Sequence, residues 1–180
     1  MILKLAGAAS VIIAATLIGL EMSQTLKRRV ENIESFISSM QYMENAIDFT
    51  LSPINEIIET LSKEAKGAAG EFFKELSSMG QVWSGKEQVL SGGETGGVPG
   101  KWHVCLVNCK GISRDDKAAL GALGAHLGTS GKDAQIATIR LCQHRLNTLL
   151  ECAKQEFQAN GKMLKGLGFF GGILITITLI

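Results

Sequence analysis

Residues 26–47 read LKRRVENIESFISSMQYMENAI, and an apolar side chain recurs there every three or four positions. With one step missed at Glu44, the repeated positions are Leu26, Val30, Ile33, Ile37, Met40 and Ile47. Phe36 and Met43 widen this stripe. A spacing of this kind places apolar side chains on one face of an α-helix. The stretch therefore predicts an amphipathic helix that ends near Thr50–Leu51.

Two further amphipathic segments follow. We expect Ser52 to cap the next helix and Pro53 to occupy its first position, where the missing backbone N–H has no partner to lose. The apolar residues of this helix are Ile54, Ile57, Ile58 and Leu61. A third, shorter helix is expected around Phe72, Phe73, Leu76 and Met79.

Glycine and polar residues then dominate the chain, which predicts a flexible loop over about residues 81–100. A short helix is expected around Trp102–Cys109. Ser113–Asp116 resembles a capping box, with aspartate in place of the usual glutamate, and opens a helix that runs to about Gly128.

Ser130–Asp133 has a similar cap-like pattern and opens a last long helix. Its apolar positions are Ile136, Ile139, Leu146, Leu150, Ala153 and Phe157. Together these segments predict an all-α protein, with a bundle of about six helices over residues 22–162 and no strand-rich domain.

Each end of the chain carries a long apolar segment. Ile2–Leu20 is interrupted only by Lys4, and Met163–Ile180 carries Lys165 near its start. A helix of about 20 mainly apolar residues crosses the hydrocarbon core of a bilayer, and a lysine near its end can reach the headgroups. We therefore expect transmembrane helices over residues 1–21 and 163–180.

Both segments have a competing interpretation. The first resembles a cleaved signal peptide, but its apolar stretch is longer than a typical h-region and continues into the helix-forming residues Glu21–Leu26. The second resembles a buried helix of a soluble bundle. It carries four glycines, which are costly in a water-exposed helix and common where membrane helices pack: Gly166, Gly168, Gly171 and Gly172. Membrane helices fit both segments better.

Small residues four positions apart lie on one helix face and allow two membrane helices to approach closely. Ala15 and Gly19 have this spacing in the first segment, and Gly168 and Gly172 have it in the second. These four residues are the predicted helix-packing positions in the membrane.

Basic residues flank both segments on the side of the central domain. Lys27, Arg28 and Arg29 follow the first segment, and Lys162 and Lys165 open the second. Because basic flanks stay on the cytoplasmic side, we expect a cytoplasmic central domain with both termini across the membrane.

The formal net charge of +1 argues against nucleic-acid binding, which needs a basic face. The four cysteines would stay reduced in a cytoplasmic domain, which argues against a disulfide framework.

Three patterns contain residue types that occur in catalytic, nucleotide-binding or metal sites, and none of the three supports such a site. Gly80–Glu87 satisfies the GxxxxGK part of a phosphate-binding loop, but Glu87 stands where a magnesium-binding Ser or Thr is needed and no strand precedes it, so a solvated loop is expected. His126 has no nucleophile placed near it and is expected on a helix surface.

Zinc ligand types occur without a zinc-finger spacing at His103, Cys105, Cys109, Cys142, His144 and Cys152. Buried cysteines that behave as small apolar residues are the simpler interpretation. We therefore assign no catalytic residue, no metal ligand and no cofactor.

The order of these features resembles the stage III sporulation protein AB family of endospore-forming bacteria. Near the N-terminus the resemblance is carried by the span ending Ile18–Gly19, by Leu26 and by Arg28–Arg29. Leu51–Glu56 is similar to the TPL-x-EA turn of that family, although Ser52 replaces its usual threonine.

Further along, the tryptophan before a short helix matches Trp102. The stretch D-x3-L-x2-LG-x2-LG matches Asp116, Leu120, Leu123, Gly124, Leu127 and Gly128, and the D and Q that follow it match Asp133 and Gln135. A short glycine-containing C-terminal span completes the likeness. The Gly85–Gly100 loop departs from the family in being unusually rich in glycine, which puts in doubt any contact made through it.

The resemblance implies a platform or adaptor in the membrane that the mother cell places around the forespore. The family belongs to the channel assembly between these two cells, and its helical domain is similar to the inner-membrane platform of type II secretion and type IV pilus machines. The implied partners are the other proteins of the stage III sporulation A complex, including the secretion-type ATPase AA, together with lipid and a possible second copy of the chain. A membrane-tethered metal- or nucleotide-dependent enzyme and a generic helical membrane adaptor stay open as alternatives.

Overall fold

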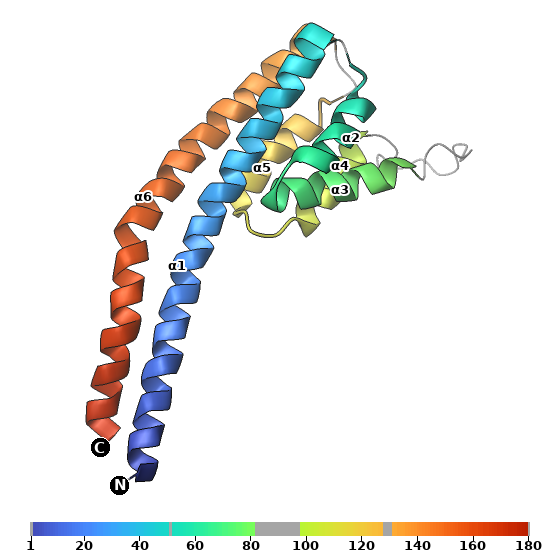
Figure 1. Cartoon of the computed structure of the whole chain (residues 1–180). Helices are drawn as coiled ribbons and strands as arrows, with labels where there is room; N and C mark the ends of the chain where they lie inside the picture. The colour runs from blue at the N-terminus through green and yellow to red at the C-terminus, as the bar shows by residue number, and fades with distance from the viewer. Residues whose placement is uncertain (1, 51, 82–97, 128–130, 180) are drawn as a thin grey trace. The chain divides into compact units, whose positions relative to one another are not determined.

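The computed structural model describes the backbone of residues 2–50, 52–81, 98–127 and 131–179. Side chains are described for residues 13–50, 52–79, 98–127 and 131–160 and for Met163. Every regular element in these residues is helical, so the expected all-α class is confirmed. The six α-helices (Figure 1) are α1 (Ile2–Asn45), α2 (Ile54–Glu64), α3 (Gly67–Gln81), α4 (Val98–Asn108), α5 (Arg114–Gly124) and α6 (Lys132–Leu179), and a π-helical turn (Ala46–Thr50) follows α1.

The chain divides into two compact units. Met1–Val30 and Glu151–Ile180 form the first, here called the terminal unit, and Glu31–Leu150 forms the second, here called the central unit. Helices α2 to α5 lie wholly within the central unit, whereas α1 and α6 each contribute to both units.

Four aromatic rings form the centre of the core of the central unit. Phe36 of α1, Phe72 and Phe73 of α3, and Trp102 of α4 are all almost completely buried. Phe72 meets Trp102 edge to face, with ring centroids 4.8 Å apart, and meets Phe36 in the same way at 5.8 Å. Such pairs add about 0.5–1.5 kcal/mol each beyond the burial of their apolar area. The cluster therefore joins three helices that are far apart in the sequence.

The predicted apolar faces of α1 and α6 are confirmed within the central unit. Six positions of α1 and the turn after it are buried, namely Ile33, Phe36, Ile37, Met40, Met43 and Ile47. On α6 the buried positions are Ile136, Ile139, Cys142, Leu146 and Leu150. Removal of each large apolar side chain from water is worth about 1.5–3 kcal/mol, so these two faces supply much of the drive for folding.

The junction between α1 and α2 corrects one prediction. The helical path ends at Thr50, as expected, but Pro53 rather than Ser52 is the N-cap of α2, and no side chain caps this helix. Pro53 has an extended ψ of 143°, so Ile54 is the first helical residue. The Pro53 carbonyl accepts a hydrogen bond from the Ile57 N–H at 3.2 Å. Pro53 is therefore the residue before the first turn of α2, and the helix begins one residue later than predicted.

Three other helix boundaries differ from the predicted ones. Helix α3 was expected to be shorter than α2, but it has 15 residues and α2 has 11. It begins nearer the N-terminus than predicted, where Ala68 adds to its buried face. Helix α4 already begins at Val98, since Pro99 is tolerated in a first turn. Helix α5 ends at Gly124 rather than near Gly128.

Two expectations lie outside the described residues. These are most of the flexible loop, which was predicted over about residues 81–100 and of which 82–97 are not described, and the cap at Ser130. At the two ends of the predicted loop the prediction is wrong, since Gln81 belongs to α3 and residues 98–100 belong to α4. Helix α6 begins at Lys132, and the Gln135 N–H donates to the Gly131 carbonyl at 3.0 Å.

Within the terminal unit, Arg29 of α1 and Glu156 of α6 form an ion pair at 3.2 Å. Large apolar side chains on this part of α1 are exposed, namely Ile13, Leu17, Ile18, Leu20 and Met22. Across the described residues, no helix carries an apolar run long enough to cross a bilayer. Of the two expected spans, the side chains of residues 1–12 and 164–180 lie outside the described part of the chain.

Candidate interaction surface

Two of the motifs quoted above meet inside the central unit. The buried indole of Trp102 donates its Nε1–H to the Leu120 carbonyl at 2.9 Å. Gly124, one turn further along α5, lies so close to the indole that a Cβ atom there would overlap the ring. Only glycine allows α5 to pack this closely on α4. These motif residues therefore build the framework of the central unit.

The predicted capping box at the start of α5 is confirmed. The Ser113 hydroxyl accepts a hydrogen bond from the Asp116 N–H at 3.2 Å, and an Asp116 carboxylate oxygen accepts from the Ser113 N–H at 2.7 Å. The Asp116 side chain is completely buried, so this reciprocal pair satisfies a carboxylate that water cannot reach.

Asn32 of α1 is a structural residue that the sequence pattern did not reveal. Its amide Nδ2–H donates to the Gly111 carbonyl at 2.9 Å, and its Oδ1 accepts from the Ala68 N–H at 3.1 Å. Gly67 and Gly111 both have positive φ, of 58° and 79°, and a Cβ atom on either would press on this amide. One side chain therefore holds the α2–α3 turn and the α4–α5 loop against α1.

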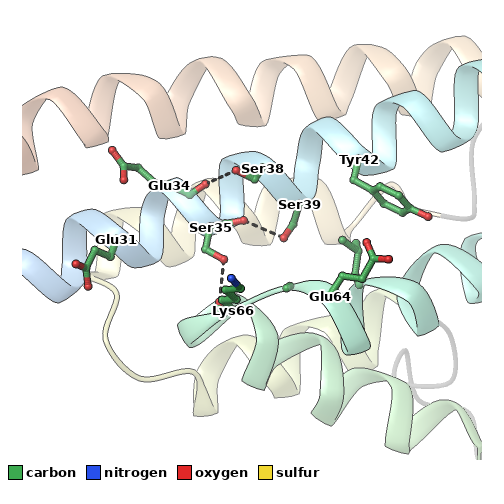
Figure 2. A pocket seen from close by; sticks show the side chains of 10 residues that line it. Glu31, Glu34, Ser35, Ser38, Ser39, Tyr42, Glu64 and Lys66 are labelled. Carbon is green, nitrogen blue, oxygen red and sulfur yellow. Dashed lines mark hydrogen bonds between the residues drawn. The ribbon is translucent and has the colours of Figure 1, made fainter.

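A groove on the surface of the central unit, here called the acidic groove, lies between α1 and the C-terminal end of α2 (Figure 2). Its volume is about 440 Å³, and its charged lining residues are Glu31, Glu34, Glu64 and Lys66. Tyr42 adds a partly exposed phenol ring. With three carboxylates against one ammonium group, the groove favours a positively charged partner.

One serine of the acidic groove ties its two walls together, and two others bond within α1. Ser35 Oγ donates to the Lys66 carbonyl at 2.8 Å, which ties α1 to the residues after α2. Ser39 donates to the Ser35 carbonyl at 2.9 Å, and Ser38 donates to the Glu34 carbonyl at 3.0 Å. Because each hydroxyl donates to a backbone carbonyl rather than to a base, none of these three serines is an activated nucleophile.

The expected burial of the cysteines holds for Cys105, Cys109 and Cys142 but is wrong for Cys152, which is exposed. Burial raises the pKa of the Cys105 and Cys109 thiols to about 11 and that of Cys142 to about 12. Thiols with such high pKa values stay protonated at neutral pH, whereas metals and electrophiles require the thiolate.

No group of three or more His, Cys, Asp or Glu side chains comes together as a metal site within the described residues. His103 and His144 are exposed, on α4 and α6. His126 is exposed as well, but it lies in the turn after α5 and not on the helix itself. The GxxxxGK pattern falls largely on residues 82–87, outside the described part of the chain.

The four predicted helix-packing residues lie on the two helices that form the terminal unit. On α1, Gly19 is buried and Ala15 is half-buried. Gly168 and Gly172 lie on α6, where their surroundings are outside the described side chains. Their role in helix packing stays a prediction.

Comparison with known proteins identifies the class of this helical protein. The family model for stage III sporulation protein AB matches residues 4–180. Stage III sporulation protein AB of Bacillus subtilis (strain 168) is 24% identical over 177 residues, which is 98% of this chain and 99% of that relative. The chain belongs to the stage III sporulation protein AB family, as its sequence motifs predicted.

A solved structure of stage III sporulation protein AB (SpoIIIAB) has a similar fold. The TM-score is 0.59 at 16% identity, and the match covers 72% of this chain and 96% of that chain. At this identity the likeness shows the fold alone. The family supports a role in sporulation, and these relatives are named as sporulation proteins rather than as enzymes.

Proposed function

We propose that this protein is a membrane-anchored platform of a secretion-like channel complex between mother cell and forespore. In this role it couples a cytoplasmic secretion-type ATPase to the membrane components of the complex. It resides in the mother-cell membrane around the forespore, with the central unit in the cytoplasm, and it performs no chemistry of its own.

One observation carries this proposal: large apolar side chains are exposed on α1 of the terminal unit, ahead of two exposed basic residues. On α1 of the terminal unit, Ile18 is 63% exposed and Leu17 is 59% exposed. Apolar patches of this kind mark a membrane or protein contact. Lys27 and Arg28 follow on the same helix and are exposed, as expected for a flank that stays on the cytoplasmic side. The central unit has a buried apolar core and a charged groove on its surface.

The acidic groove supplies the contact for the ATPase or for another protein of the complex. Exposed carboxylates increase the association rate with a basic partner and select against acidic ones. Glu64 and Tyr42 stand on opposite walls, so the groove offers charge and an aromatic surface together. This combination fits a basic segment that also carries an apolar side chain.

Capture of the ATPase tests the proposal. The tagged full-length protein should retain the ATPase from detergent-solubilised membranes of sporulating cells. Glu64→Lys should reduce the amount retained about tenfold, because a like charge then faces a basic partner. Glu56→Lys is the matched control, since it makes the same charge change on an exposed position of α2 outside the groove. Full retention of the ATPase by the Glu64→Lys variant would show that the acidic groove is not part of the contact. No retention of the ATPase by the unchanged protein would contradict the coupling role.

The predicted topology is tested by thiol labelling in intact cells. Single cysteines placed between residues 85 and 100 of an otherwise cysteine-free protein should resist an impermeant reagent until the cells are opened. Labelling before lysis would place the central unit on the other side of the membrane.

A further inference from the structure

A second groove on the central unit, here called the α5–α6 groove, lies between α5 and α6 and has a volume of about 490 Å³. Its floor is apolar, with Ala118 and Ala119 from α5 and Leu149 from α6. Because α5 presents alanines here, the side chains that the structure describes leave the space between the two helices open. Ala118 is exposed, and Ala122, one turn further on, is exposed as well.

The two walls of this groove carry opposite charges. Asp115 stands on α5 and Arg145 on α6, and both side chains are exposed. Neither residue forms an ion pair with any described residue, although they line the same groove. His144 and Thr148 complete the polar rim. The Thr148 hydroxyl donates to the His144 carbonyl of its own helix at 3.1 Å, so it is already bonded within the wall.

A surface with a cation and an anion on facing walls, neither of them ion-paired within the described part of the chain, is complementary to itself. In a pair of molecules related by a twofold axis, every contact occurs twice: if a residue of the first copy meets a different residue of the second, the same two positions also meet with the copies exchanged. Arg145 of one copy would then face Asp115 of the second copy, and the same contact would occur again across the axis. The guanidinium and carboxylate can form two parallel hydrogen bonds in each of these contacts.

The apolar floor supports the same arrangement. Small residues at Ala118 and Ala122 are four positions apart on the exposed face of α5, so a second α5 helix can approach closely without a steric clash. Leu141 of α6, which is 51% exposed, lies one turn before Arg145 and extends the apolar surface beside the groove.

We propose that the α5–α6 groove is the contact surface between two copies of this chain. The contact is isologous, with α5 of each copy seated in the groove of the other and two Arg145–Asp115 ion pairs across the axis. The surface is small, so the pair forms and dissociates with protein concentration. It lies apart from the acidic groove, which leaves that groove free for a different partner.

Two charge reversals test this arrangement on the full-length protein in detergent micelles. Asp115→Arg places two positive walls opposite each other in a self-pair, and Arg145→Asp places two negative walls opposite each other. Each variant alone should therefore self-associate at least about tenfold more weakly than the unchanged protein in sedimentation velocity. When the two variants are mixed, both contacts across the axis again join opposite charges, and association should return.

The mixture is also the control for folding, because a misfolded variant could not restore the contact. Arg114→Asp is a second control: Arg114 is exposed and adjacent to Asp115 but does not line the groove, so self-association should be unchanged. Three results would each overturn the proposal. They are a monomeric unchanged protein at every concentration, undiminished self-association of both single variants, and a mixture that stays monomeric while both variants keep their helical circular dichroism.

Discussion

Gly124 of α5 packs directly under the indole ring of Trp102 of α4, and the Trp102 Nε1–H donates to the Leu120 carbonyl one turn earlier on the same helix. The ring thus contacts α5 twice, through its face and through its N–H. This relationship explains why the tryptophan and the leucine–glycine pair occur together in this chain: the large side chain occupies the space that the missing side chain leaves.

Gly124→Ala should destabilise the protein by about 1–3 kcal/mol, because a methyl group at this position overlaps the indole ring and forces the helices apart. Thermal unfolding followed by circular dichroism measures the effect. Gly121→Ala is the matched control in the same helix, since its Cβ would lie 3.5 Å from Leu106 Cδ2, an ordinary contact distance. There we expect unchanged stability or a gain of up to about 1 kcal/mol from helix propensity. Equal melting temperatures for the two variants would rule out the steric argument.

Asn32→Ala should cost about 1–3 kcal/mol, because the Gly111 carbonyl and the Ala68 N–H both lose their partner. Asn32→Asp should also destabilise the protein, since its carboxylate still accepts from Ala68 but places an oxygen instead of a donor against the Gly111 carbonyl. Denaturant titrations give both values. Asn147→Ala serves as the control, because the Asn147 amide bonds only to a carbonyl of its own helix on an exposed face, and we expect a change within about 0.5 kcal/mol. An Asn32→Ala variant as stable as this control would show that the two turns hold their shape without the amide.

The buried thiols should make the protein less stable in alkaline solution. Burial raises the pKa of Cys105 and Cys109 from 9.0 to about 11 and that of Cys142 to about 12. Below about pH 9 the thiols are protonated in both the folded and the unfolded chain, so they add no pH dependence. Above it the unfolded chain loses protons that the folded chain retains, and the free energy of unfolding falls as the pH rises toward 11.

The same free energy measured for a variant with alanine at these three positions should fall less steeply between about pH 9 and pH 11. Other groups titrate equally in both proteins, so the difference isolates the thiols. Parallel curves for the two proteins would mean that the thiols ionise in the folded state as readily as in the unfolded state.

Replacement of Cys105 and Cys109 together by alanine should leave sporulation largely intact and cost about 1–3 kcal/mol of stability. The physical reason is that both thiols act as small apolar groups in the core. Spore counts and metal analysis of the purified proteins check this. Loss of a stoichiometric zinc ion, or loss of sporulation by a normally folded variant, would give these cysteines a chemical role.

Gly172→Ile should leave the protein in the membrane fraction but impair its assembly, because close helix approach in lipid depends on small residues. Gly171→Ile is the control, since the neighbouring position points to a different face of the same helix. Blue-native electrophoresis of solubilised membranes compares the two. Normal assembly of Gly172→Ile would indicate that this face meets only lipid.

Structural features that depend only on residues within about four positions of each other were predictable from the sequence. The buried face from Ile33 to Ile47 follows from its spacing, because one face of a helix repeats every 3.6 residues. The capping box of Ser113 and Asp116 follows for the same reason, since both partners lie within one turn. The start of α2 was predicted one residue too early, because the dihedral angles around Pro53, and not its residue type, decide whether it caps or begins a helix.

Contacts between distant segments were not predictable in this way. Asn32 looks like an ordinary polar residue of an amphipathic helix, and only the folded chain brings it to Gly67 and Gly111, which lie 35 and 79 positions further along the sequence. The grooves arise similarly, since Asp115 and Arg145 come to share one surface only after α5 packs on α6. Periodicity records which side of a helix is buried, but it carries no information on which other helix covers that side. That choice is made by the packing of the whole core, where Trp102 and Gly124 are the clearest example.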